Sequence, residues 1–260
     1  MSTDAGKHAA LIEAQFSAQA EAFARSPTLH SEAALALMVA AGAPKLSDTM
    51  LDVACGSGSV VAAFAPRVRE ATGLDATEAM LEQARRLSES RRLTNAQWLR
   101  GDACVLPFGD GAVDIVTCRF AFHHFERPEV VFAEMLRVCR SGGRIVVCDG
   151  LASVDPAKED ALNMFERLRD PSTVAFRTVE YIRALFTDAA VTEPETRYYK
   201  HPGTLSGMLK AAFPANGDVE RLRMLIERSV EGDRMGLNAR REGGDVVFET
   251  PVAIVSATRL

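Results

Sequence analysis

The sequence has 260 residues, 47% of them hydrophobic and 25% charged, and its formal net charge at pH 7 is −5. This balance is typical of a globular protein, and the length suits one α/β domain with an added cap. A protein that neutralises many phosphates usually carries a basic stripe, whereas the strongest basic cluster here, the arginines at 85–92, is better interpreted as a solvated helix face. We therefore expect no nucleic-acid partner.

The sequence also argues against membrane insertion and export. It contains no run of about 18 apolar residues, and its first thirty residues carry Asp4, Glu13 and Glu21 without a continuous apolar block. The five cysteines include no C-x-x-C pair, which favours buried free thiols over disulfides or a zinc site. We expect a cytoplasmic protein with no membrane span and no bound metal, either a monomer or a homodimer.

Strands and helices are predicted to alternate through the first 150 residues, which indicates a parallel sheet with helices on both faces. Two helices come first, at 8–25 and at 31–42, the second with Ser31 as its N-cap. The elements that follow are a strand at 50–54, a helix ending at Pro66, strands at 71–75, 97–101 and 113–118, a helix starting at Thr77 after the second strand, a helix from Pro128 to Gly142–Gly143, and a strand at 144–149.

After residue 150 the alternation stops. The predicted elements there are helices at 156–168, 178–188, 204–213 and 218–231, a strand at 191–199, and a closing strand or hairpin at 245–258.

Ligands bind an open parallel sheet beyond the carboxyl ends of its strands. The first strand ends in Ala54-Cys55-Gly56-Ser57-Gly58, where glycine lets a ligand approach the backbone and the next helix offers free N–H groups. Taken alone, this run is also compatible with a simple tight turn. A dinucleotide site normally has a third glycine where this chain has Val61.

The next two strand ends each carry an aspartate. Asp75 can accept hydrogen bonds from both hydroxyls of a ribose, although an acid here can also cap the following helix. Asp102 can accept from an adenine amino group, and the Ala103 N–H can serve a ring nitrogen. These residues together fit an adenosyl ligand. The fourth strand end, at 118–125, is expected at the centre of the sheet, beside the reacting group.

Five runs resemble the ubiquinone/menaquinone-biosynthesis-like branch of the class I S-adenosylmethionine (SAM) dependent methyltransferases, with a type 11 methyltransferase domain. These runs are 51–58, 73–81, 101–108, 114–125 and 136–149. Segments 169–172 and 248–254 are also similar to a subgroup of small-molecule methyltransferases. The resemblance implies an α/β Rossmann-like fold with a seven-stranded sheet in the order 3-2-1-4-5-7-6, strand 7 antiparallel, and SAM as a cofactor that leaves as S-adenosylhomocysteine (SAH).

The resemblance also implies residue roles. Ala54 and Arg119 are expected to contact the methionine part of SAM through their backbones, and Met80 to pack on the adenine. The expected cofactor-binding residues are Ala54, Gly56, Gly58, Asp75, Ala76, Met80, Asp102, Ala103 and Arg119. Arg25, in the N-terminal segment, is a further candidate for contact with the SAM carboxylate.

Methyl transfer is an in-line displacement at the sulfonium methyl, so the protein mainly aligns the acceptor and excludes water. If the acceptor must lose a proton, His123 and His124 are the catalytic candidates, because neutral imidazole accepts a proton near neutral pH. Either histidine could instead only shape the pocket. Phe16, Phe23 and Phe120 are the candidates for binding a small-molecule acceptor, with helix packing as the alternative for Phe16 and Phe23.

Residues outside the central run are predicted to cover the site. We expect an N-terminal helical cap at 1–47 and a methyltransferase domain at 48–260 that contains a helical cap insertion at about 201–244. The apolar stripes of these helices need a surface to pack on. We assign surface positions to His8, His30 and His201.

Other functions remain open on the sequence. A cyclase on the same scaffold would keep the SAM motifs without transferring methyl. An amino-directed nucleic-acid methyltransferase usually shows an Asn/Asp-Pro-Pro-aromatic run where this chain has 120–124, and Val61 disfavours an NAD-dependent oxidoreductase. A SAM sensor has no positive feature here, and the cysteines do not suit arsenic methylation.

Overall fold

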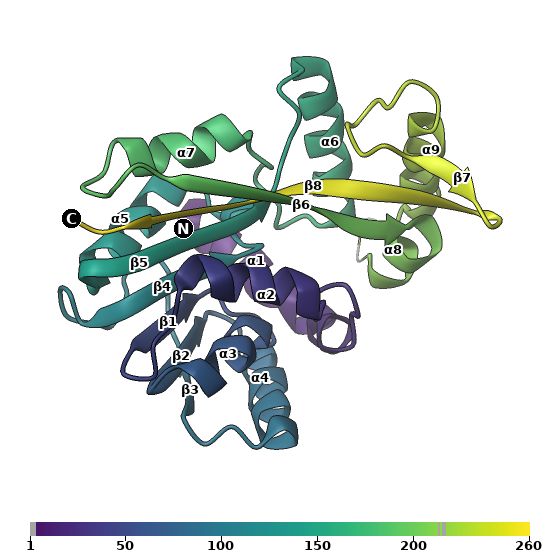
Figure 1. Ribbon diagram of the computed structural model, residues 1–260. Helices are drawn as coiled ribbons and strands as arrows, with labels where there is room; N and C mark the ends of the chain where they lie inside the picture. Colours follow the sequence, from purple (N-terminus) through teal and green to yellow (C-terminus); the bar gives the residue numbers. More distant parts are fainter. Residues whose placement is uncertain (1–3, 213, 215–216) are drawn as a thin grey trace.

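In the computed structural model, which describes residues 4–212, 214 and 217–260, eight strands form one mixed sheet in the order β3-β2-β1-β4-β5-β8-β6, with β7 paired to β8 (Figure 1). The strands are β1 Thr49–Val53, β2 Glu70–Asp75, β3 Ala96–Arg100, β4 Val113–Arg119, β5 Cys139–Gly150, β6 Glu195–Thr204, β7 Arg240–Glu242 and β8 Asp245–Thr258. Strands β1 to β5 pair in parallel, and β8 is antiparallel to both β5 and β6. This confirms the predicted order, with β8 as the predicted strand 7.

Helices cover both faces of the sheet, as predicted (Figure 1). One face packs against α5 (Pro128–Val138) and α7 (Val179–Thr187) through Phe132 and Phe186, and the other packs against α2 (Glu32–Gly42) and α3 (Ser59–Phe64) through Met38 and Phe64. The α-helices are α1 Asp4–Ala24, α2 Glu32–Gly42, α3 Ser59–Phe64, α4 Glu78–Arg91, α5 Pro128–Val138, α6 Pro156–Arg169, α7 Val179–Thr187, α8 Leu205–Ala211 and α9 Val219–Ser229, and the 3₁₀ turns are η1 Ala65–Arg67 and η2 Phe122–His124.

The predicted N-cap of α2 is present. The Ser31 side chain accepts a hydrogen bond from the Ala34 N–H, which satisfies one of the free donors of the first turn. The prediction that Gly142–Gly143 ends α5 was wrong. The helix ends at Val138 and Cys139 is already extended. The glycines belong to an irregularity of β5, where a Cβ on Gly143 would lie 2.7 Å from the Asp114 carbonyl oxygen.

A third apolar cluster lies beyond the main sheet, where β6 and β8 extend past the other strands toward α6, α8 and α9 (Figure 1). The prediction that β6 stops at residue 199 was wrong: pairing with β8 continues to Thr204, so 201–204 belongs to the sheet and not to the inserted helices. The predicted end of a helix at residue 213 lies outside the described residues. No helix in the described part of the chain has both the length and the apolarity of a membrane crossing.

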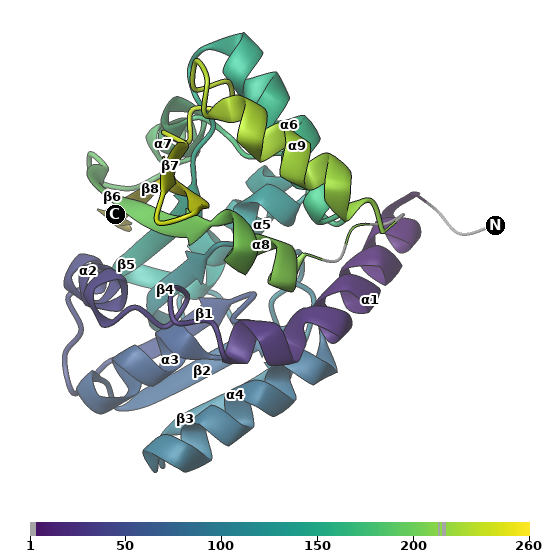
Figure 2. The ribbon, with the colours of Figure 1, turned by 90° about the vertical axis from the view of Figure 1, so that its right-hand side faces the viewer.

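Helix α1 lies along α4 and reaches α8 (Figure 2). Its side chains also meet the segment after β4: the Phe16 ring packs edge-on against the His124 ring at 4.9 Å. The N-terminal helix therefore lies over the carboxyl end of the central strand, next to the residues singled out for chemistry.

Candidate active site

A tight turn joins β1 to α3 through three residues with positive φ. Ala54, Gly56 and Gly58 have φ values of 54°, 52° and 83°. A Cβ on Gly58 would lie 2.5 Å from Trp98 and 2.9 Å from the Cβ of Ala84, so this glycine is needed for packing under the turn. A Cβ on Gly56 would meet nothing within 4 Å, so this glycine borders open space at the strand end.

Asp75 connects the ends of β1 and β2. Its carboxylate accepts one hydrogen bond from the Gly56 N–H at 2.8 Å and another from the Thr77 N–H at 2.9 Å. The side chain is 9% exposed, and burial raises its pKa. Each oxygen can still accept a second hydrogen bond, so the carboxylate is able to hold a diol while keeping the turn in place.

The other residues predicted on the adenosyl side occupy the same end of the sheet. Met80 is buried on α4, whereas Ala76 is exposed. Ala103 is buried, and the exposed Asp102 accepts from the Cys104 N–H at 2.8 Å, which holds its side chain in a local turn.

Arg119, at the end of β4, contributes a buried guanidinium and not only its backbone. Its side chain is 8% exposed and lies 4.5 Å from the ring centre of Phe120. Nη1 donates to the Leu29 carbonyl at 2.9 Å and lies 3.5 Å from the Ser59 hydroxyl, while Nε and Nη2 are buried and form no hydrogen bond of good geometry with any residue that the structure describes.

Asp52 was missed in the sequence because it was treated as an ordinary strand residue. It is 1% exposed, and the Thr117 hydroxyl donates to it at 2.6 Å. Burial raises its pKa to about 7, and the neighbouring Arg119 charge offsets part of that rise. An acid inside an otherwise apolar strand was the available signal.

His123 is held by Asp149, a second residue that the sequence did not single out. The His123 Nδ1 lies 2.7 Å from one oxygen of Asp149, and the His123 backbone N–H donates to the other at 2.9 Å. Asp149 is 2% exposed and also accepts from the Gly150 N–H. The His123 ring stacks on Phe176 at 4.3 Å. With Nδ1–H directed at the carboxylate, the neutral ring presents Nε2 as an acceptor.

His124 is enclosed by structural partners. The Ser172 hydroxyl donates its single hydrogen to Asp170, so His124 Nδ1 is the donor in its 3.1 Å contact with that hydroxyl. Gln19 of α1 also donates to Asp170, and the His8 ring nitrogen bonds to the His124 carbonyl oxygen at 2.8 Å. Burial, with His123 as the second cause, lowers the pKa of His124 to about 3.

The three candidate acceptor residues fall into two groups. Phe16 packs on Phe23 and His124, beside the histidine pair. Phe120 packs edge-on to His201 at 5.4 Å, on the Arg119 side.

The exposure of four basic residues in the flanking segments bears on the roles predicted for them. Arg25 is exposed and pairs with Glu21, so it does not reach into the site. His201, assigned to the surface from the sequence, is half-buried, and burial lowers its pKa to about 4. His30 is also half-buried, and its Nε2 has no hydrogen-bond partner among the described residues. His8 is half-buried and bonds the His124 carbonyl oxygen.

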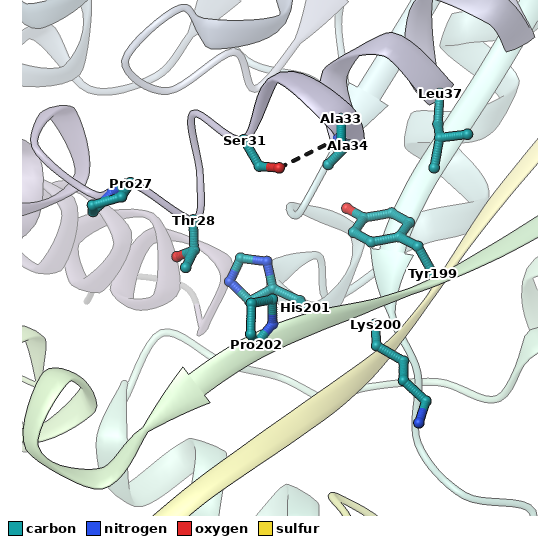
Figure 3. A pocket seen from close by; sticks show the side chains of 10 residues that line it. All are labelled: Pro27, Thr28, Ser31, Ala33, Ala34, Leu37, Tyr199, Lys200, His201 and Pro202. Atoms are coloured by element: carbon teal, nitrogen blue, oxygen red, sulfur yellow. Dashed lines mark hydrogen bonds between the residues drawn. The ribbon is translucent and has the colours of Figure 1, made fainter. Parts of the chain in front are cut away.

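A cavity of about 420 Å³ opens beside His201, between the start of α2 and strand β6 (Figure 3). Its lining includes Thr28, Ser31, Leu37, Tyr199, His201 and Pro202.

Comparison with known proteins identifies the family. A family profile described as a methyltransferase domain matches residues 51–147. The uncharacterized methyltransferase YcgJ of Bacillus subtilis is 29% identical over 238 residues, which cover 91% of this chain and 94% of YcgJ. A demethylmenaquinone methyltransferase of Clavibacter sepedonicus is 31% identical over 179 residues, which cover 67% of this chain and 72% of that enzyme.

The fold agrees with these matches. The crystal structure of YcgJ has a TM-score of 0.79 to this chain at 26% identity, covering 87% of this chain and 98% of YcgJ. A putative methyltransferase from Bacillus halodurans C-125 has a TM-score of 0.76, also at 26% identity, covering 87% of this chain and 99% of its own. The chain belongs to the class I SAM-dependent methyltransferases. Its cofactor is therefore SAM, and the NAD-dependent oxidoreductase alternative is set aside.

Proposed function

We propose that this methyltransferase acts on a free small molecule whose accepting atom loses its proton to His123. The observation that carries the proposal is the buried His123–Asp149 pair, with the 2.7 Å contact at Nδ1. A buried carboxylate that fixes the tautomer leaves Nε2 to accept a proton, as a general base requires. Asp149 is then a positioning residue that acts through His123.

In this proposal the cofactor binds along the carboxyl ends of the strands. The ribose diol would be held by Asp75, the adenine edge by Asp102 and Ala103, and the methionine part would cross the turn at Gly56. The open space at Gly56 and the spare acceptor capacity of Asp75 support this fit. SAM supplies the electrophilic methyl group when bound, and the protein aligns the acceptor with that methyl group.

His124 has a positioning role in this account, while Phe16 borders the acceptor. The contacts of His124 with Ser172 and with His8 tie α1 to the segment after α6. This tie supports the proposal that α1, in the N-terminal cap at 1–47, roofs the site. Helices α8 and α9 would complete the roof as an insertion in the domain at 48–260, since α8 contacts α1.

The small-molecule acceptor is supported by two independent observations. The demethylmenaquinone methyltransferase of Clavibacter sepedonicus is named for a small acceptor, and ubiquinone/menaquinone biosynthesis C-methyltransferase UbiE of Roseobacter denitrificans is 35% identical over 126 residues. The formal net charge of −5 disfavours a polyanionic acceptor such as a nucleic acid.

An acceptor screen tests the proposal. The wild-type enzyme is incubated with methyl-labelled SAM and separate pools of phenols and enols, amines, and nucleic acids, and both SAH and labelled product are measured. We expect one SAH per methyl group in the pool whose accepting atoms are hydroxyls or acidic carbons. Label in nucleic acid, or in amines only, would contradict the proposed acceptor class.

A further inference from the structure

We infer that the Arg119 guanidinium binds the methionine carboxylate of SAM. Arg119 lies at the carboxyl end of β4, and the sequence had assigned only its backbone to the cofactor. An arginine that is buried and only partly hydrogen-bonded is uncommon, because desolvating a cation is costly unless an anion or several acceptors replace the lost water. Arg119 is 8% exposed, and its Nε and Nη2 form no hydrogen bond of good geometry in the described part of the chain.

The groups around this guanidinium do not neutralise it. Asp52, on β1, is an acid that interacts electrostatically with Arg119. The two side chains form no ion pair, and the Asp52 carboxylate already accepts a hydrogen bond from Thr117. The Tyr199 hydroxyl on β6 and the Cys148 thiol on β5 lie close enough to Arg119 for hydrogen bonding, but burial raises the pKa of both groups, so both are neutral near pH 7. The site therefore holds a positive charge that no ion pair neutralises among the described residues.

Two further neighbours are neutral histidines. Burial lowers the pKa of His201, and the Arg119 charge lowers it further. Burial likewise lowers the pKa of His30, with Arg91 and Arg119 as additional lowering charges. Neutral histidines do not compensate the Arg119 charge, so that charge is available to an anionic ligand.

The position of the guanidinium fits the far end of the methionine chain. Its Nη1 lies 3.5 Å from the hydroxyl of Ser59, the first residue of α3, directly after the Gly56–Gly58 turn. A methionine chain that crossed this turn would bring its carboxylate toward the start of α3. The planar guanidinium can meet a carboxylate with two parallel N–H donors. Arg25, the earlier candidate, is exposed and paired with Glu21.

An anionic acceptor could present the same carboxylate chemistry, because Tyr199 and His201 also line the cavity in Figure 3. The two sources are separated by a ligand that differs from SAH in one group. Decarboxylated SAH keeps the adenosine, the thioether and the amine and lacks only the carboxylate.

The test measures the dissociation constants of SAH and decarboxylated SAH by calorimetry for the wild-type enzyme, Arg119→Lys and Arg119→Gln. We expect wild type to bind SAH about 10- to 100-fold more tightly than the decarboxylated ligand, as expected for a lost charge-assisted hydrogen-bond pair. Arg119→Gln should bind both ligands equally, at the wild-type affinity for decarboxylated SAH. Arg119→Lys should keep part of the discrimination.

The control is Arg197→Gln on the half-exposed edge of β6, which should leave both constants unchanged. Full discrimination in Arg119→Gln would place the carboxylate elsewhere and overturn the inference, as would a wild-type enzyme that does not discriminate. If Arg119→Gln does not fold, Arg119→Lys decides, since undiminished discrimination there overturns the inference. A wild-type enzyme that binds neither ligand would instead contradict SAM as the cofactor.

Discussion

Replacing His123 with alanine is expected to lower the methyl-transfer rate by about 10²- to 10⁴-fold at saturating SAM, the usual contribution of a positioned general base. The affinity for SAH should stay within about twofold of wild type, because His123 is not among the proposed cofactor contacts. Asp149→Asn should also lower the rate, since an amide no longer fixes the Nδ1–H tautomer of His123. Single-turnover kinetics with an acceptor from the screen measure both effects.

His124→Ala is the matched comparison, because the His124 side chain bonds Ser172, which donates to Asp170, and packs against Phe16 of α1. We expect it to lower the melting temperature more than it lowers the rate of the folded enzyme. Because burial lowers the pKa of His124 below its usual value, we do not expect His124 to cause an ionisation seen near pH 7. A parent-like rate in His123→Ala would show that the pair does not act as a base.

Gly58→Ala should cause the largest loss of stability among substitutions in the turn after β1. The new Cβ would lie 2.5 Å from Trp98 at a residue whose φ is 83°. Overpacking costs about 1–3 kcal/mol and a left-handed backbone about 1–2 kcal/mol, so the free energy of unfolding should fall by about 2–5 kcal/mol. Denaturant unfolding without ligand measures this change.

Gly56→Ala is the matched control for that prediction. Its φ is 52°, but its Cβ would meet no atom within 4 Å. Only the left-handed backbone cost remains, roughly 1–2 kcal/mol. This variant should instead lose SAH affinity, because the new methyl occupies the space proposed for the methionine chain. Equal destabilisation by the two substitutions would contradict the separate roles of the two glycines.

The order of the sheet was predictable because each strand carries a local apolar pattern and family motifs mark the first five strand ends. The prediction errors lie where pairing between strands that are distant in the sequence determines the secondary structure. Residues 201–204 have no strong strand pattern of their own, yet β8 supplies them with backbone partners, as in the pair His201–Thr250. Likewise, the irregular start of β5 at Gly142–Gly143 depends on pairing with β4 and could not be distinguished from a helix end.

The site residues likewise fall into those that local sequence predicts and those that only the fold reveals. Gly56 and Asp75 could be proposed because each follows a predicted strand, and the structure brings them to 2.8 Å. The pairing of His123 with Asp149 spans 26 residues, and the bond from Arg119 to Leu29 spans 90. No local pattern indicates such pairings, so the positioning carboxylate and the buried guanidinium emerged only from the fold.

The most direct test of the account is a calorimetric titration of the wild-type enzyme and Asp75→Ala with SAH and with NADH. The adenosyl site at the strand ends predicts one SAH site per wild-type chain and no NADH binding. Removing a charge-assisted acceptor costs roughly 1.5–3 kcal/mol, so folded Asp75→Ala should bind SAH about 10- to 100-fold more weakly. Tight NADH binding without SAH binding, or an unchanged SAH affinity in folded Asp75→Ala, would contradict the account.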